Sequence, residues 1–275
     1  MLTFGWFSSG RDQAAIDLLA AIHDRLVSGY IPGQIAFVFC DREPGEDQAA
    51  DQFQAAVQAR QLPLVTYSSR SLREKIRQRA PDLEKARTAF DQAVIEQVQG
   101  YEAQLIVLAG YMLVLSPKLC TKFLCLNLHP ALPGGHIGTW QQVIWQLIAD
   151  EASSAGAMMH LATPALDRGP AVTYCHFSLT GPDFAPFWQQ LRKKRQLLGL
   201  REIIQQEGEA EPLFARLRAE ELKREFPLII LTLKLLAEGR LQLTPAGVQA
   251  AGQLLPQGQC LTEQVEAFLA DRSEN

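Results

Sequence analysis

Short apolar segments alternate with helical patterns along the first half of the chain, and this alternation restricts the folds it can adopt. Consecutive apolar residues, typical of strands covered on both faces, predict strands at 2–7, 35–40, 105–111 and 123–129. Apolar residues at helical spacing predict helices between them, at 12–29, 45–62 and 89–101. We therefore expect an α/β fold with a mainly parallel sheet and helices on both faces. In such folds ligands bind at the carboxyl ends of the strands.

The pattern changes after residue 150. Two strand-like segments flank a loop at 164–170 and predict a hairpin that closes the sheet. Residues 184–225 are charged and favour two solvated helices, followed by one buried helix, a short strand and a polar tail. We expect three parts: a catalytic core at 1–182, a charged helical insertion at 183–225, and a C-terminal helix, short strand and tail at 226–275 that complete the core.

Composition excludes several classes of protein. The 275 residues are 47% hydrophobic, enough to bury a core, and the net charge of -4 argues against binding nucleic acid through its phosphates. No apolar stretch is long enough for a membrane span, and the N-terminus lacks a leader pattern, so we expect a cytoplasmic protein. The five cysteines lack metal-type spacing and are interpreted as buried thiols.

Two polar side chains, Asn127 and His129, share one face of the strand predicted at 123–129. Residues at i and i+2 lie about 7 Å apart on the same side of a strand, so both can address one bound group. An amide can donate to a developing oxyanion, and an imidazole can exchange a proton near neutral pH. The same spacing also fits a capping asparagine and a hydrogen-bonded histidine. Asp167 can hold an imidazolium, although its loop equally fits a common turn.

The segment between the first strand and the first helix contains serines followed by Gly10, Arg11 and Asp12. Free amides at a helix start, together with the positive end of the helix dipole, can bind an anion. A carboxylate at Asp12 suits a helix N-cap instead and repels phosphate. Phosphate binding and simple N-capping both fit this stretch.

Four ordered segments resemble the folate-dependent formyltransferase family, and within it most closely the phosphoribosylglycinamide formyltransferases. They are LAGYMLVLSP, NLHPALP, GAMMHLATPALDRGPAV and FPLIILTLKLLAEGRLQL. The resemblance covers residues 1–182 and resumes near 213, so the charged segment between resembles an insertion. It implies a Rossmann-like formyltransferase fold, 10-formyltetrahydrofolate as co-substrate and no metal.

By this resemblance, the catalytic residues are Asn127, His129 and Asp167. In that family the matching asparagine and protonated histidine stabilise the oxyanion that forms when an amine attacks the formyl carbonyl. The histidine and an aspartate-held water then move a proton from the amine to the folate nitrogen. Preorganised donors of this kind lower the barrier because the charge develops only in the transition state.

The resemblance also implies binding residues. Those for folate are Met112, Leu113, Leu115, His160 and Thr163, although His160 on an apolar strand is equally explained as a core histidine. Those for the acceptor are Gly10, Arg11, Asp12 and Arg87, with Glu221, Lys223 and Glu225 also where the family has substrate contacts. Arg87 falls where the family has an arginine that contacts a ribotide phosphate, whereas Arg11 and Asp12 replace the family's serine and asparagine. The glycine-rich stretch around His136 replaces a longer family segment that contains histidines. His136 is interpreted as a loop residue, the alternative being that it substitutes for one of those histidines.

The resemblance implies an enzyme that transfers the formyl group of 10-formyltetrahydrofolate to an amine, with glycinamide ribonucleotide as the favoured acceptor in de novo purine biosynthesis. Alternatives are another amine acceptor, such as an amino sugar nucleotide or methionyl-tRNA, and formyltetrahydrofolate hydrolase. A folate-binding module without chemistry would not need all three catalytic residues. We expect folate and a small phosphorylated amine as partners, neither membrane nor nucleic acid, and allow for a homodimer.

Overall fold

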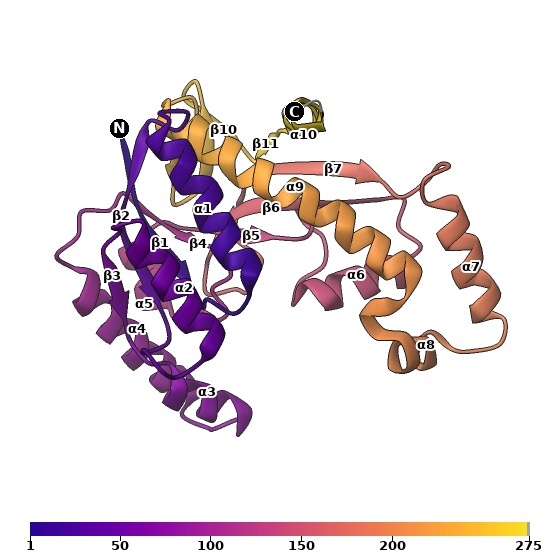
Figure 1. Ribbon diagram of the computed structural model, residues 1–275, viewed down its shortest axis with the longest axis horizontal. Coiled ribbons are helices and arrows are strands. Elements are labelled where there is room, and N and C mark those ends of the chain that lie inside the picture. The colour runs from indigo at the N-terminus through magenta and orange to yellow at the C-terminus, as the bar shows by residue number, and fades with distance from the viewer. Residues whose placement is uncertain (274–275) are drawn as a thin grey trace.

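An eight-stranded sheet forms the centre of the computed structural model, which describes residues 1–273 (Figure 1). Its strand order is β11-β7-β6-β5-β4-β1-β2-β3. The neighbours from β5 to β3 are parallel, whereas β6 is antiparallel to both β5 and β7. The strands are β1 (Leu2–Ser8), β2 (Gly33–Cys40), β3 (Leu64–Thr66), β4 (Leu105–Leu108), β5 (Cys125–His129), β6 (Ser154–Leu161), β7 (Ala171–Ser178) and β11 (Gln259–Cys260).

Helices cover both faces of this sheet, as predicted. The helices are α1 (Gln13–Val27), α2 (Gln48–Ala59), α3 (Arg70–Arg77), α4 (Leu83–Val98), α5 (Pro117–Lys122), α6 (Trp140–Ala149), α7 (Ala185–Arg195), α8 (Leu200–Glu207), α9 (Pro212–Ala237) and α10 (Thr262–Ser273). Buried side chains of α1, α2 and α9 belong to one apolar core, and those of α3, α4 and α5 belong to a second. None of the described helices has the length and apolar character needed to cross a membrane.

The prediction of a separate buried helix after residue 225 is wrong. A single helix, α9, runs from Pro212 to Ala237 with Pro227 inside it. Its first half packs in a third core through Phe214 and Leu217. Its second half packs against the sheet through Leu228 and neighbouring residues. Apolar anchors at both ends hold the helix continuous despite the proline. The border of the insertion remains a prediction, and residue 225 lies inside this helix.

The C-terminal segment has more structure than the predicted strand and tail. Three short strands, β8 (Gln242–Thr244), β9 (Gly247–Ala250) and β10 (Gln253–Leu255), form a small antiparallel sheet. β11 then adds to β7 at the edge of the main sheet, and α10 packs against α9. The sequence predicted the β6–β7 hairpin correctly, but this hairpin does not close the sheet, because β11 extends it beyond β7.

The cysteines are free thiols, three of them buried and two partly buried. Burial is the main cause that raises the pKa of Cys40 and of Cys120 to about 11 and that of Cys175 to about 12. Thiols with such pKa values are protonated at neutral pH and react slowly. These three cysteines are therefore suited to packing rather than to redox or nucleophilic chemistry.

Candidate active site

Asn127, His129 and Asp167 come together where β5 ends beside the β6–β7 loop. In the antiparallel register of β5 and β6, Asn127 lies opposite His160. Asp167 reaches this place from the loop, with a left-handed φ of 52° that aspartate tolerates better than most residues. Its Oδ1 lies 3.8 Å from His129 Nδ1 and 3.8 Å from His160 Nε2. The structure thus brings four of the predicted residues into one cluster, in which His129 and His160 are buried and Asn127 and Asp167 are partly buried.

Hydrogen bonding defines the roles of His160 and Asn127. His160 Nδ1 lies 3.1 Å from the Leu161 carbonyl oxygen, which can only accept, so Nδ1 carries a hydrogen. Burial, together with the nearby His129, lowers the pKa of His160, which keeps the ring neutral and Nε2 an acceptor. Asn127 Nδ2 donates to this Nε2 at 3.0 Å. The asparagine amide is therefore oriented, and its second N–H is left for a ligand.

His129 is held by a hydrogen bond from its Nε2 nitrogen. Its Nε2 lies 3.0 Å from the backbone carbonyl oxygen of His136, so Nε2 donates and Nδ1 faces Asp167. The backbone N–H of Gly138 donates to Asp167 Oδ2 at 3.1 Å. The side chains of His129 and Asp167 are only 4% and 8% exposed. A protonated His129 would thus have a buried carboxylate as its counter-charge.

A cavity of about 440 Å³ opens from this cluster, within the size range of small-molecule sites. Its lining includes the remaining residues predicted for folate: Met112, Leu113, Leu115 and Thr163. Met112 and Leu166, both in the lining, are 49% and 47% exposed. Large apolar side chains left open beside a cavity are suited to covering an apolar or aromatic ligand.

Another part of the cavity lining comes from α6 and α9, and its charged side chains belong to α9. The guanidinium of Arg218 lies 4.5 Å from the ring centroid of Trp140, and its Nη1 lies 2.6 Å from Glu225 Oε1. All three residues line the cavity. Behind them, neither carboxylate oxygen of the fully buried Glu221 has a hydrogen-bond partner among residues 1–273. Burial, and then the charge of Glu225, raise the pKa of Glu221 well above its usual value.

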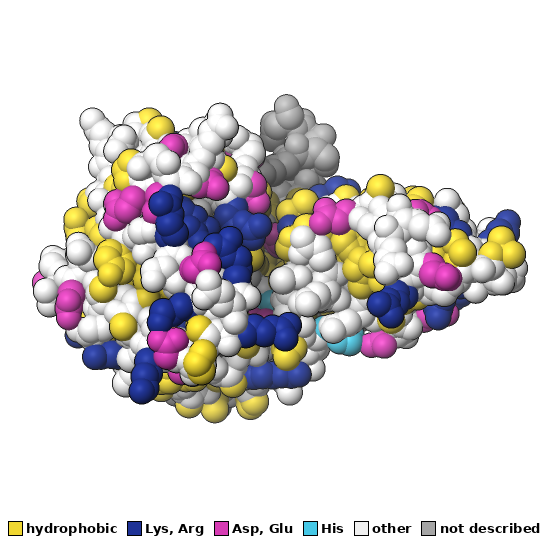
Figure 2. Space-filling view, turned by 90° about the horizontal axis from the view of Figure 1, so that it is seen from below, with side chains coloured by type: hydrophobic (Ala, Val, Ile, Leu, Met, Phe, Trp, Pro, Cys, Tyr) yellow, Lys and Arg dark blue, Asp and Glu magenta, His cyan; other side chains and the backbone are white. Residues whose placement is uncertain are grey.

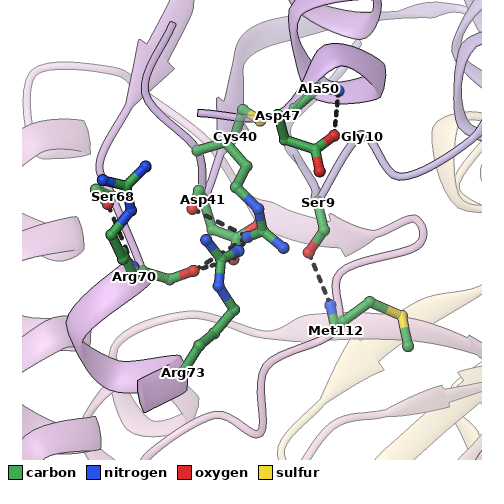
Figure 3. A network of polar contacts seen from close by, with 12 residues as sticks. Ser9, Gly10, Cys40, Asp41, Asp47, Ala50, Ser68, Arg70, Arg73 and Met112 are labelled. Atoms are coloured by element: carbon green, nitrogen blue, oxygen red, sulfur yellow. Dashed lines mark hydrogen bonds and ion pairs between the residues drawn. The ribbon is translucent and has the colours of Figure 1, made fainter. Parts of the chain in front are cut away.

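The loop between β1 and α1 is tied to the wall predicted for folate. Met112 N donates to Ser9 Oγ at 3.1 Å, as Figure 3 shows. Gly10 has a φ of 59°, and a Cβ there would lie 2.9 Å from Phe53 Cβ, so only glycine fits well. Asp12 accepts a hydrogen bond from Ala15 N and caps α1. The N-cap interpretation of Asp12 is therefore confirmed, while Arg11 lies exposed beside it.

A network of charged residues lies at the end of β2, next to this loop (Figure 3). Buried Asp41 accepts hydrogen bonds from Arg42 and from Ser69 Oγ. Arg73 Nη1 lies 3.6 Å from the same carboxylate and, although buried, has no hydrogen-bond partner in the described part of the chain. Figure 2 shows Lys and Arg side chains gathered on the larger body, beside the hollow between it and the narrower extension.

Comparison with known proteins shows the family to which the chain belongs. The family model described as formyl transferase matches residues 13–179, more than half of the chain. The chain belongs to the formyl transferase family. The phosphoribosylglycinamide formyltransferase of Haemophilus influenzae is 27% identical over 246 residues, which cover 86% of this formyl transferase and 90% of that protein. The Escherichia coli protein of the same name is 31% identical over 93 residues, 32% of this chain and 41% of that protein.

The extent of these matches differs between relatives. Apart from the Haemophilus protein, the matched relatives are each spanned over less than half of their length, between 40% and 46%. Glycinamide ribonucleotide transformylase 1 from Symbiobacterium toebii has a TM-score of 0.62 at 24% identity, covering 91% of this chain and 94% of that one. A formyltetrahydrofolate deformylase from Burkholderia mallei has a TM-score of 0.59 at 18% identity, covering 90% and 69%. The fold is therefore shared with both kinds of enzyme.

The residues predicted to bind the acceptor of this formyl transferase are more scattered than those predicted for folate, which line one cavity. Arg87 lies on α4, where its Nη1 is bonded to Glu84 of the same helix, and it is outside the cavity lining. Its contact with a phosphate stays a prediction, as do those of Gly10, Arg11 and Asp12. Sequence reasoning did not include Arg42 and Arg73. Arg42 follows the end of β2, which pairs with the end of β1, and Arg73 contacts the same carboxylate of Asp41 in the network of Figure 3.

Sequence reasoning also missed Trp140 and Arg218. A signal was present, because Arg218, Glu221 and Glu225 are spaced by three and four residues and so share one helix face. Such a mixed-charge face is normally solvated. Only the packing of α9 against α6 shows that this one faces a cavity.

Proposed function

We propose that the protein transfers the formyl group of 10-formyltetrahydrofolate to a phosphorylated amine, with glycinamide ribonucleotide as acceptor, in purine biosynthesis. The observation that carries the proposal is the cluster of Asn127, His129 and Asp167 at one end of a cavity with an apolar wall. Membership of the formyl transferase family supports the reaction class. The Haemophilus relative, matched over most of its length, supports the acceptor.

Asn127 stabilises the charge that forms on the formyl oxygen. Attack by an amine turns a neutral carbonyl oxygen into an oxyanion, and a fixed N–H donor in a water-poor site stabilises it strongly. The hydrogen bond from Asn127 Nδ2 to His160 holds one N–H and thereby aims the other. His160, which sequence reasoning assigned to folate binding, has its best-supported role here as a positioning residue.

His129 and Asp167 transfer the proton from the attacking amine to the leaving nitrogen. Because Nε2 of His129 is already bonded to the His136 carbonyl, Nδ1 is the nitrogen that gains and loses a proton. Asp167, 3.8 Å away, stabilises the imidazolium while the amine proton passes to the leaving nitrogen.

The cavity walls fit the two substrates. Met112 and Leu166 offer exposed apolar area to the aromatic pterin, and backbone groups of the neighbouring loops offer polar contacts. A phosphate on the acceptor is supported by Arg42 and Arg73 beside the β1–α1 loop, since guanidinium groups suit phosphate oxygens. Asp41 and Glu46 hold these arginines in place.

A second candidate is hydrolysis of 10-formyltetrahydrofolate, because two deformylase structures share the fold with TM-scores of 0.59 and 0.58. Water would then take the place of the amine at the same three residues. The aromatic and charged wall of Trp140, Arg218 and Glu225 favours transfer, because water needs no recognition surface.

The test is a formyl-transfer assay with 10-formyltetrahydrofolate and glycinamide ribonucleotide, following folate release by absorbance and the formylated product by mass spectrometry. We expect turnover that needs the acceptor and falls at least 100-fold in Asn127→Ala and His129→Ala. Lys193→Ala, on the exposed face of α7, is the control and should retain wild-type rates.

Each other outcome points elsewhere. Folate release that is independent of acceptor would establish the hydrolase. Release that appears only with an amino sugar nucleotide or with methionyl-tRNA would replace the acceptor and keep the reaction. Absence of release with every acceptor, in a protein that still binds folate, would refute the proposal.

A further inference from the structure

The loop of residues 133–138 holds the catalytic histidine by its backbone. His129 Nε2 donates to the carbonyl oxygen of His136 at 3.0 Å. A carbonyl oxygen cannot donate, so this contact selects the tautomer with hydrogen on Nε2 and leaves Nδ1 toward Asp167. The same loop ends at Gly138, whose N–H holds Asp167. The position of the loop therefore affects both members of the pair.

Little else in the loop's own sequence makes it rigid. Three of its six residues are glycine, and Gly134 and Gly138 have left-handed φ values of 74° and 115°. Glycine allows many backbone conformations, so such a loop needs external anchors. One anchor is Thr139, which caps α6 directly after the loop. Another is Arg168, whose Nη1 donates to the Gly135 carbonyl oxygen at 3.4 Å.

A further anchor is the side chain of His136. Its Nε2 lies 3.1 Å from Asp150 Oδ2, at the C-cap of α6. Glu151, the next residue, is engaged elsewhere by Arg192 and Arg195 of α7. The pair formed by His136 and Asp150 thus ties the middle of the loop to the far end of the helix that begins where the loop ends.

We propose that His136, held by Asp150, is a positioning residue that fixes the backbone carbonyl and so keeps His129 in the tautomer with Nδ1 facing Asp167. This inference rests on the proposed function for its kinetic consequence. The pair is partly exposed, with side chains 32% and 62% accessible, and exposed ion pairs contribute little to folding stability. Misplacement of a catalytic group, in contrast, lowers rates strongly. Loss of the pair should thus affect turnover more than stability.

The kinetic experiment compares His136→Leu, Asp150→Ala and the double variant in the formyl-transfer assay, because neither replacement side chain can form a hydrogen bond. We expect kcat to fall about tenfold in each single variant, with the KM for folate unchanged. The double variant should be no slower than the singles, because all three break the same contact. Glu151→Gln is the control: it removes the charge of the acid next to Asp150, just after α6, and leaves the loop anchor intact, so it should keep wild-type kcat.

A second readout does not need turnover. Nitrogen-15 NMR of the imidazoles, with His129 assigned by loss of its signals in His129→Ala, reports which ring nitrogen carries hydrogen. We expect the Nε2–H form of His129 in the wild type and in Glu151→Gln, and a mixture of tautomers in His136→Leu and Asp150→Ala. A merely structural anchor would leave the His129 signals unchanged.

Two results would overturn the inference: an unchanged His129 tautomer in both variants, or a kcat that falls equally in Glu151→Gln. Failure of the proposed function is separable from failure of the anchor. A wild-type protein without formyl transfer would refute the function, while the tautomer measurement would still decide the role of His136.

Discussion

At the scale of one residue, His160 determines the direction in which the Asn127 amide points. Replacing it with leucine removes the acceptor that orients Asn127. We predict that kcat falls about 10- to 100-fold, because an amide that is no longer held in place stabilises the oxyanion less strongly. His160→Gln, whose side-chain oxygen can accept the same hydrogen bond, should recover part of the rate. Steady-state kinetics of both variants would test this, and equal losses in the two would contradict it.

Glu221 is a residue whose effect on stability depends on pH. Its pKa is raised in the folded state, so between the unfolded pKa and the folded pKa the native protein binds the extra proton. Stability from this group is thus present at low pH and is lost as pH rises. Glu221→Gln removes that loss, and we predict a melting temperature above wild type at pH 8, with the difference shrinking toward pH 5. A pH-independent difference in thermal melts would refute this.

The residues proposed for catalysis were predictable from sequence to different degrees. The spacing of Asn127 and His129 places them on one face of a strand whatever the fold, and the family resemblance adds Asp167. The contact of Asn127 with His160 depends on the antiparallel register of β5 and β6. The stacking of Arg218 on Trp140 joins two helices far apart in the chain. No local pattern specifies either contact.

At the scale of elements, the β6–β7 hairpin determines where Asp167 lies. A Cβ at Gly169 would lie 1.6 Å from the Leu161 carbonyl oxygen, so the backbone must shift to accept any side chain. We predict that Gly169→Ala costs about 3 kcal/mol of unfolding free energy, since overpacking is costly, and lowers kcat by moving Asp167. Gly100→Ala, where a Cβ meets no atom within 4 Å, should stay close to wild type. Urea unfolding and kinetics of both variants would decide.

Elements with strong periodicity were predicted well, and short ones were missed. The strands of the parallel sheet read as apolar runs, and α1 has a clear apolar stripe. β3 has only three residues, and α3 has only two apolar side chains, Leu72 and Ile76, so neither is long enough for the run or repeat that predicts the longer elements. The C-terminal strands depend on pairing with β7 and with each other, which a local pattern cannot predict.

At the scale of the whole molecule, α9 joins two apolar cores. Its first half packs with α6, α7 and α8 in the extension seen in Figure 1, and its second half packs under the sheet. The cavity lies beside this helix, with Arg218 and Glu225 between the two packed halves. A change that loosened the extension would therefore also move the charged wall of the site.

This continuity predicts cooperative unfolding. Phe214 lies 4.8 Å from the ring of Trp145 in the core of the extension, and Phe214→Ala should cost about 3–5 kcal/mol. Three of the four tryptophans (Trp140, Trp145 and Trp188) pack in that core, so fluorescence follows the extension while far-UV circular dichroism follows the whole chain. We predict that both signals shift together to lower urea concentration, because the shared helix cannot unwind at one end without exposing apolar surface at the other. Leu222→Ala, at a 38% exposed position of the same helix, should shift neither. A fluorescence transition that precedes the circular dichroism transition would instead mean that the extension unfolds as a separate unit.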